Sequence, residues 1–363
     1  MATTRRRVLA AGALAPLAAS RSLDHRVSAR QATPPAGTPA AGGGTTEVVA
    51  RGLVNPRGFT WLPDGRMVVA EAGSGGPTAR VVAVEPDGTL TELLGGFPTA
   101  RVVFRGISGI ADVAIGPDGQ LYALVSGGDI NRDLARNGLY RLDGAGGAEF
   151  VADISAFIRD NPVANVPGDY DDDGQPYRLL PTAEDDGYVV TEGNSCQLLR
   201  VGLDGTVARV ADLSADNWIP TGLAEADEGE VYAATFTGAP FAAGSARVLR
   251  VAGDGSLETA WSNLTMVTDL ALGPDGNCYA LEMASGYSQD TGGPVPESGR
   301  VVRLRSDRPD APEVLVEGLH YPAHLRIGPE WADGGAPVIY VSGPTLEADD
   351  ASGTVIRVTL PSA

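Results

Sequence analysis

The sequence contains no lysine, only two cysteines, and few aromatic residues, which make up 6% of its 363 residues. Arginine is therefore the only strongly basic side chain, and 27 arginines stand against 46 acidic residues for a formal net charge of -19. A surface of this sign repels phosphate backbones and anionic lipid, so we expect binding neither to nucleic acid nor to a membrane surface. The simpler interpretation of this net charge is that it keeps the protein soluble.

Several catalytic motifs are absent as well. There is no Gly-x-Ser-x-Gly, no phosphate-binding loop and no dinucleotide fingerprint, and the chain has three histidines, of which His25 lies near the N-terminus. His320 and His324 are four residues apart at the entrance of an expected strand, which does not fit a helical zinc motif. These absences favour a protein that is not an enzyme.

The most informative feature is a repeated unit. Residues 109 to 127 form an apolar run, a Gly-Pro-Asp-Gly turn and a second apolar run. Proline presets φ, aspartate bonds back to the main chain and glycine accepts the left-handed position, so the unit predicts a β-hairpin. Related hairpins occur at 55 to 73 and 268 to 282, with degenerate copies at 176 to 193, 220 to 238 and 322 to 343.

A second hairpin follows each copy, which gives four strands per unit. A period of about 40 to 70 residues with four strands per unit is typical of a propeller blade. The sequence therefore predicts an all-β protein, a six-bladed β-propeller. Residues 353 to 361 supply only the third strand of the last blade, and residues 46 to 53 resemble the outer strands. We expect this N-terminal strand to complete the last blade and close the ring, which hides its edges.

Three segments divide the chain. Residues 1–32 predict an export signal of the twin-arginine type, because arginines after Thr4 precede an uncharged run that is too short to span a bilayer. The cleavage site stays open, and an Arg-rich start without export is the alternative. Residues 33–45 predict a Pro/Gly/Ala linker, and 46–361 a single propeller. We expect a secreted or periplasmic monomer that has no membrane contact after cleavage.

The two cysteines, Cys196 and Cys278, fall in the third and fifth blades. Cysteines in an oxidising compartment can pair, but these blades are not neighbours. We therefore expect no disulfide between them.

Polar residues mark the inner ends of the predicted strands on the face with the long connections, where binding residues are favoured. Three interpretations stay open: ion pairs that tie the blades together, a ligand or ion site, and a catalytic site. His324 is also interpreted as a hydrogen-bonding residue of the channel wall. The candidate ligand-binding residues are Arg57, Glu71, Asp112, Arg178, Glu192, Thr221, Asp269, Glu282 and His324.

Two kinds of metal site come into question. Lactonase-like propellers hold a divalent cation with oxygen ligands from several inner strands. The arginines at the inner strands of this chain count against such a site. The acids at 71, 112, 269 and 282 could still hold one ion. Separately, Asp169, Asp171 and Asp173 precede Gly174 in the pattern of the first half of a calcium loop. Leu180 at the twelfth position excludes an EF-hand, and a solvated acidic loop is the alternative to calcium.

Two motifs are more specific than the repeat, namely Asn-Pro-Arg-Gly at 55 to 58 and Thr-Gly-Ala-Pro-Phe at 237 to 241. With the rest of residues 46 to 360, they resemble the ScyD/ScyE family, whose repeat is shared with NHL-like, SMP-30-like and gluconolactonase-like propellers. The resemblance implies an exported six-bladed propeller without an assigned activity. The sequence at 173 to 178 departs from the family pattern and introduces Arg178.

Together these features predict an exported propeller that binds a small molecule, an ion or a protein partner on its long-loop face, without evident catalysis. One alternative is a metal-dependent hydrolase of the lactonase or strictosidine-synthase-like kind, with one divalent ion held by the channel acids. The cofactor stays open, and calcium is the ion that the acidic loop suggests. A second alternative is a protein-interaction scaffold.

Overall fold

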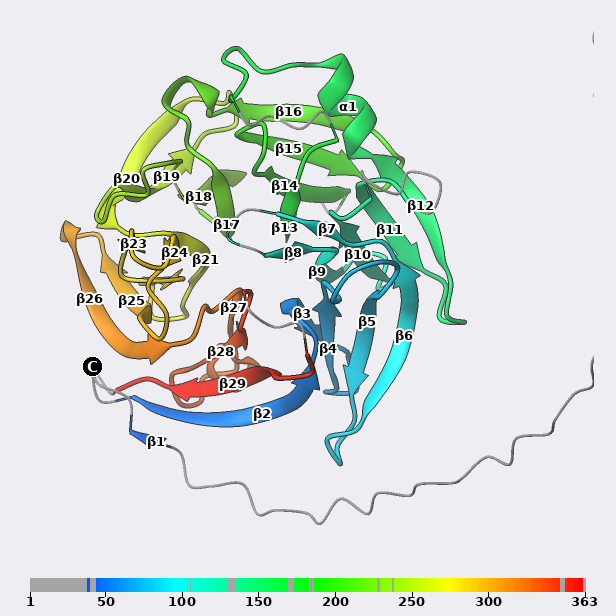
Figure 1. Ribbon diagram of the computed structural model, residues 1–363, viewed down its shortest axis with the longest axis horizontal. Helices are drawn as coiled ribbons and strands as arrows, with labels where there is room; N and C mark the ends of the chain where they lie inside the picture. Colours follow the sequence, from blue (N-terminus) through cyan, green and yellow to red (C-terminus); the bar gives the residue numbers. More distant parts are fainter. Residues whose placement is uncertain are drawn as a thin grey trace, which may run out of the picture. The chain divides into compact units, whose positions relative to one another are not determined.

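Six antiparallel sheets form a ring in the part of the chain from Pro35 to Ala363 (Figure 1). The structure is a computed structural model that describes residues 38–39, 44–102, 104, 106–128, 135–168, 173–182, 184, 186–226, 229–236, 238–346 and 350–361. Each sheet is one blade of a six-bladed β-propeller, so the predicted fold class is confirmed. The predicted signal, residues 1–32, lies outside the described residues.

The first three blades follow the chain in order, with the innermost strand first. Blade 1 contains β3 (Pro56–Trp61), β4 (Met67–Glu71), β5 (Ala79–Val84) and β6 (Leu90–Phe97). Blade 2 contains β9 (Ile110–Ile115), β10 (Leu121–Val125), β11 (Gly138–Leu142) and β12 (Ala148–Asp153). Blade 3 contains β13 (Pro176–Pro181), β14 (Gly187–Glu192), β15 (Gln197–Gly202) and β16 (Val207–Asp212).

The last three blades repeat this layout and close the ring. Blade 4 contains β17 (Pro220–Glu225), β18 (Val231–Thr235), β19 (Ala246–Val251) and β20 (Leu257–Leu264). Blade 5 contains β21 (Val267–Leu272), β22 (Cys278–Glu282), β25 (Gly299–Arg305) and β26 (Arg308–Leu319). Blade 6 contains β27 (Leu325–Ile327), β28 (Val338–Gly343), β29 (Gly353–Thr359) and, from the N-terminal side, β2 (Thr45–Leu53), which β1 (Thr38–Pro39) extends.

The pairing of β2 with β29 confirms the predicted closure. The two strands are antiparallel from the Thr45–Thr359 pair to the Leu53–Gly353 pair, and Figure 1 shows them side by side. Ala50 and Leu53 of β2 pack with Phe59 and Val69 of blade 1, so the N-terminal strand also seals the contact between the last blade and the first.

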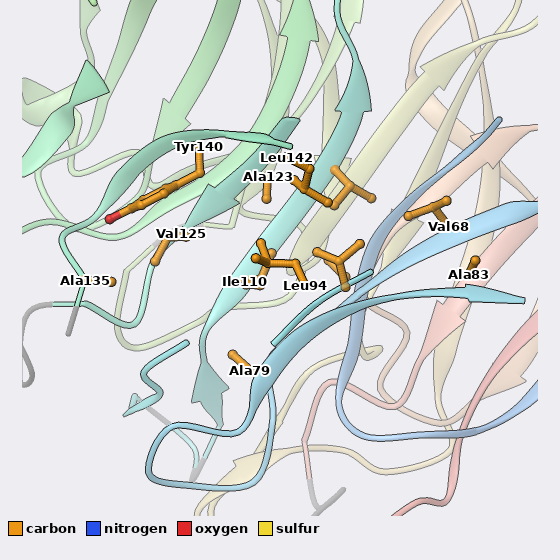
Figure 2. Close-up of a cluster of buried hydrophobic side chains, with 13 residues drawn as sticks. Val68, Ala79, Ala83, Leu94, Ile110, Ala123, Val125, Ala135, Tyr140 and Leu142 are labelled. Atoms are coloured by element: carbon orange, nitrogen blue, oxygen red, sulfur yellow. The ribbon is translucent and has the colours of Figure 1, made fainter. Parts of the chain in front are cut away.

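The hydrophobic core is divided among the contacts between adjacent blades. In Figure 2, Val68 and Leu94 of blade 1 face Ile110, Ala123 and Val125 of blade 2. These residues alternate along their strands with side chains that point to the other face of the sheet. Similar clusters join the other neighbouring blades. Each fully buried aliphatic side chain contributes about 1.5 to 3 kcal/mol, so the ring is held together by many such contacts.

Short strands, helices and a turn lie in the connections between the strands of the blades. These are β7 (Ala100–Arg101) with β8 (Ile107–Ser108), α1 (Ile154–Asp160), a 3-10 turn (Ser214–Asp216), β23 (Tyr287–Ser288) with β24 (Gly293–Pro294), and α2 (Pro329–Ala332). The carboxylate of Asp153 caps α1 by accepting the Ala156 N–H at 2.8 Å. No helix in the described ranges is long and apolar enough to cross a membrane. Cys196 and Cys278 are both buried and form no disulfide with each other, as expected.

Candidate functional site

One recurring hydrogen bond aligns the six innermost strands. In each blade, a main-chain N–H just beyond the second strand donates to a carbonyl at the entrance of the first strand. The carbonyls belong to Asn55, Gly109, Gln175, Ile219, Met266 and Tyr321. The third residue after each carbonyl belongs to one ring of contacts around the axis, which we call the axial ring: Gly58, Asp112, Arg178, Gly222, Asp269 and His324.

The two carboxylates of the axial ring are saturated with hydrogen bonds. Asp112 accepts the N–H groups of Val113 and Leu179 and one bond each from Arg178 and Arg326, at 2.8 to 2.9 Å. Every one of its four lone-pair positions therefore has a donor.

Asp269 repeats this arrangement on the opposite side of the ring. It accepts the N–H groups of Leu270 and Leu325 and again one bond each from the guanidiniums of Arg178 and Arg326, at 2.9 to 3.0 Å. The axis therefore has a twofold pattern, in which blades 2 and 5 supply the acids and blades 3 and 6 supply the arginines.

Glycine occupies the axial ring in the remaining two blades. A Cβ atom at Gly58 would lie 1.7 Å from Asp112 Oδ1, and one at Gly222 would lie 2.5 Å from the main-chain nitrogen of Leu270. Both glycines are needed because the neighbouring aspartate segment occupies that space. The axis is thus filled by packed, paired groups.

Burial and pairing act together on the axial charges. Burial by itself would raise the pKa of Asp269, but Arg178, His324 and Arg326 outweigh it and hold that pKa well below its usual range. Burial lowers the pKa of His324, whose ring stacks on Tyr177 at 4.7 Å and whose Nδ1 lies 3.4 Å from Asp269 Oδ2. The cluster therefore holds two carboxylates, two guanidiniums and a neutral imidazole.

These residues do not fit the divalent cation that lactonase-like propellers hold. A cation needs oxygen lone pairs, and those of Asp112 and Asp269 are already occupied by main-chain N–H groups and arginines. Among the described residues, no group of three or more His, Cys, Asp or Glu side chains is arranged to hold a metal ion.

The three predicted glutamates lie outside the axial ring. Glu71, Glu192 and Glu282 are the last residues of β4, β14 and β22, and each is fully buried within its own blade. Glu71 accepts the Val54 N–H at 2.7 Å and pairs with Arg80.

The other two glutamates act in the same way. Glu282 accepts the Thr265 N–H at 2.7 Å and pairs with Arg300, and Glu192 accepts N–H groups from Gln175, Asn194 and Ser195. All three carboxylates therefore fasten the entrance of an inner strand to its own blade.

Asp173, the described member of the predicted calcium loop, is also paired. Its carboxylate binds Arg159 of α1, and its main-chain oxygen accepts bonds from Asn137 and Ser155. Asp169 and Asp171 lie outside the described residues, so calcium binding there stays a prediction.

A cavity of about 380 Å³ opens at the long-loop face. Its lining residues come from the entrances of the inner strands and from the connections between strands and blades. Arg57, Tyr177, Thr221 and Thr268 contribute to the lining, and each is the residue immediately before an axial-ring position. Of the nine predicted residues, Arg57 and Thr221 thus line the cavity, whereas Asp112, Arg178, Asp269 and His324 belong to the axial ring.

The cavity wall is mainly apolar and partly aromatic. Phe104, from the connection between blades 1 and 2, packs against Phe241 of blade 4 with ring centroids 4.9 Å apart. Tyr287 of blade 5 stacks on Phe241 at 5.7 Å from behind this wall and is not itself part of the lining. The wall also includes Val102, Ile219, Phe236, Met283 and Leu346.

Four of the lining residues hold an unusual backbone. Phe104, Cys196, Asn217 and Phe241 are not glycine, yet each has φ between 52° and 56°. Such conformations cost on the order of 1 to 3 kcal/mol each and concentrate at ligand sites. Their occurrence around one cavity supports a functional role for it.

Our sequence reasoning missed Arg326, Tyr177 and the aromatic wall. Arg326 lies two residues beyond the axial-ring position of its blade and reaches the axis through its long side chain. The aromatic residues stand in connections that do not repeat from blade to blade, so no periodic signal marks them.

The fold defines the chain as a six-bladed β-propeller, and the solved structures that it resembles include gluconolactonases, a sugar dehydrogenase and a lyase. They include a gluconolactonase from Xanthomonas campestris, with 14% identity, a TM-score of 0.57, and coverage of 91% of this chain and 96% of that one. The PQQ-bound aldose sugar dehydrogenase of Streptomyces coelicolor is 15% identical, with a TM-score of 0.56 and coverage of 89% and 100%.

Virginiamycin B lyase from Staphylococcus aureus is 14% identical, with a TM-score of 0.52 and coverage of 88% and 100%. At these identities the likeness establishes the fold alone. No protein-family model matches the sequence, and no curated protein matches it.

Proposed function

We propose that this protein binds a small, largely apolar molecule in the central cavity of its long-loop face and does so without catalysing a reaction. The observation that carries the proposal is the cavity itself. Its volume of about 380 Å³ lies in the range of about 300 to 1,000 Å³ that is usual for small-molecule sites, and its wall is apolar with a few polar groups at the floor.

The axial ring supports binding rather than catalysis. Its carboxylates are saturated by arginines and main-chain donors, so neither acid has a lone pair left for a cation. The ring instead gives the cavity a rigid floor, which is the support that a preorganised binding site requires. The resemblance to the ScyD/ScyE family and the predicted export signal at residues 1–32 support binding outside the cytoplasm.

A fluorescence titration with N-phenylnaphthylamine, a neutral apolar dye, tests the proposal. We expect saturable binding of one dye per chain. Ala239→Trp, which places a bulky ring at the cavity wall, is expected to weaken this binding at least tenfold. Ala242→Trp is the matched control, because Ala242 is exposed in the same connection and does not line the cavity. Equal dye binding by both variants would contradict the proposal.

A metal-dependent hydrolase is the second candidate, and the gluconolactonase among the structural neighbours favours it. It requires a bound divalent ion, which would raise the melting temperature of the protein by linkage. Melting with and without a chelator separates the two candidates. Binding without a metal predicts no shift, and a stoichiometric ion whose removal lowers the melting temperature would support the hydrolase.

A further inference from the structure

Arg57 is a buried cation whose hydrogen-bond partners are neutral. Its guanidinium donates to the hydroxyl of Thr345 and to the main-chain oxygens of Ile107 and Thr345. The side chain is 8% exposed and reaches the cavity floor. Within the described part of the chain, no carboxylate forms an ion pair with it.

The other two arginines of this region have carboxylate partners, which Arg57 lacks in the described part of the chain. Arg178 and Arg326 are comparably enclosed, and each pairs with both axial aspartates. A charge removed from water is costly unless an opposite charge accompanies it. Burial lowers the pKa of the Arg57 guanidinium.

Arg57 is also the only charged side chain among the described residues that line the cavity. The rest of the lining is apolar or carries neutral hydroxyl, amide and thiol groups. One guanidinium at the end of an apolar cavity matches a molecule with one anionic group and an apolar body. A carboxylate accepts charge-assisted hydrogen bonds from a guanidinium, and these are stronger than bonds between neutral groups.

We infer that the ligand of this cavity is a small monocarboxylate with an apolar, aromatic-compatible body, whose carboxylate is the missing partner of Arg57. The inference rests on the proposed function, because it names the chemical class of the molecule that occupies the same cavity. The body of the ligand lies against Phe104, Phe241 and Met283, while the carboxylate reaches Arg57 at the floor of the cavity.

Calorimetric titration with cinnamate and with cinnamamide tests the inference, because the two probes have nearly the same shape and differ in charge. A hydrogen bond to a charged group contributes about 1.5 to 3 kcal/mol, so we expect the wild-type protein to prefer cinnamate at least tenfold. Arg57→Gln is expected to abolish the preference for cinnamate over cinnamamide.

Arg247→Gln is the matched control. Arg247 lies over the Trp218 ring at 4.8 Å, has no carboxylate partner in the described structure and does not line the cavity. This variant should keep the full preference for cinnamate, which would show that the effect belongs to Arg57 rather than to any unpaired arginine.

Each outcome decides one of the two proposals. Equal affinity of the wild-type protein for both probes, or binding of N-phenylnaphthylamine without binding of cinnamate, overturns the carboxylate inference and leaves the proposed function standing. Failure of the neutral dye to bind overturns the proposed function and the inference with it. The wild-type comparison needs no variant, so the test holds even if Arg57→Gln does not fold.

Discussion

Gly58 and Asp112 come so close that a Cβ atom at residue 58 would lie 1.7 Å from Asp112 Oδ1. Glycine at this position lets Asp112 reach both Arg178 and Arg326 across the axis. A larger side chain in blade 1 would displace the carboxylate on which two guanidiniums depend.

Gly58→Ala is therefore expected to lower the free energy of unfolding by about 3 kcal/mol, the upper end of the usual cost of overpacking. Denaturation in urea measures this directly. Gly253→Ala is the control, because a Cβ atom at Gly253 meets nothing within 4 Å and its φ is not in the left-handed region. Equal free energies of unfolding for the two variants would contradict this prediction and show that the axial ring accommodates the added methyl group.

Asp269→Asn should destabilise the protein by about 3 to 5 kcal/mol at pH 7, because it leaves two buried guanidiniums with only one of the two carboxylates that they share. The pKa of Asp269 is lowered in the folded state, so its contribution is complete above the unfolded value of 3.8 and is lost as the pH falls through the folded value. The difference between wild type and variant should thus be constant from pH 7 to 5 and shrink in stronger acid. A difference that is unchanged at the lowest pH where the protein still folds would contradict the pairing.

Glu71→Gln tests the distinction between the buried glutamates and the cavity. The Glu71 carboxylate accepts the Val54 N–H and pairs with Arg80, so its loss should reduce the free energy of unfolding by about 2 to 3 kcal/mol. Dye binding should stay unchanged, since Glu71 does not line the cavity. Glu92→Gln is the control, because Glu92 is an exposed partner of the same arginine at 3.7 Å. Loss of dye binding in a stable Glu71→Gln protein would show that Glu71 does belong to the binding site.

Removal of residues 46–53 tests ring closure. This change takes away nearly all of β2, which leaves β29 unpaired on one side and removes Ala50 and Leu53 from the core between blades 6 and 1. We expect loss of the cooperative thermal transition of the whole propeller. A chain that begins at residue 35 is the control and should melt like the full chain, whereas a normal transition after the deletion would contradict closure by β2.

The hairpin repeat predicted the six blades and their closure because turn residues mark every blade. The same repeat placed Arg57 and Thr221 one residue away from the axial ring. The pairing register shifts at the start of the inner hairpin in blades 1 to 5, so this shift does not set blades 1 and 4 apart. What sets them apart is glycine at the axial position, which leaves the preceding residue as the nearest polar side chain. The sequence pattern also made Glu71 and Asp112 equal candidates for the binding site. In the structure, the Glu71 carboxylate faces its own blade and the Asp112 carboxylate faces the axis.

The cavity escaped prediction for a related physical reason. Its wall is made by connections such as the one that carries Phe104 and the one that carries Phe241, and these have no counterpart in the other blades. Loops of this kind meet only when the ring closes. The sequence of these loops reveals their residue composition, but it does not reveal which loops line the same cavity.

The most direct test of the central claim is equilibrium dialysis of the mature protein against a small-molecule extract, followed by mass spectrometry of what the protein retains. The account predicts that the wild type and Ala242→Trp retain the same anionic species, that Ala239→Trp loses them, and that Arg57→Gln loses the carboxylates among them. Retention of the same molecules by wild type and Ala239→Trp would show that the cavity is not the binding site, and would contradict the account.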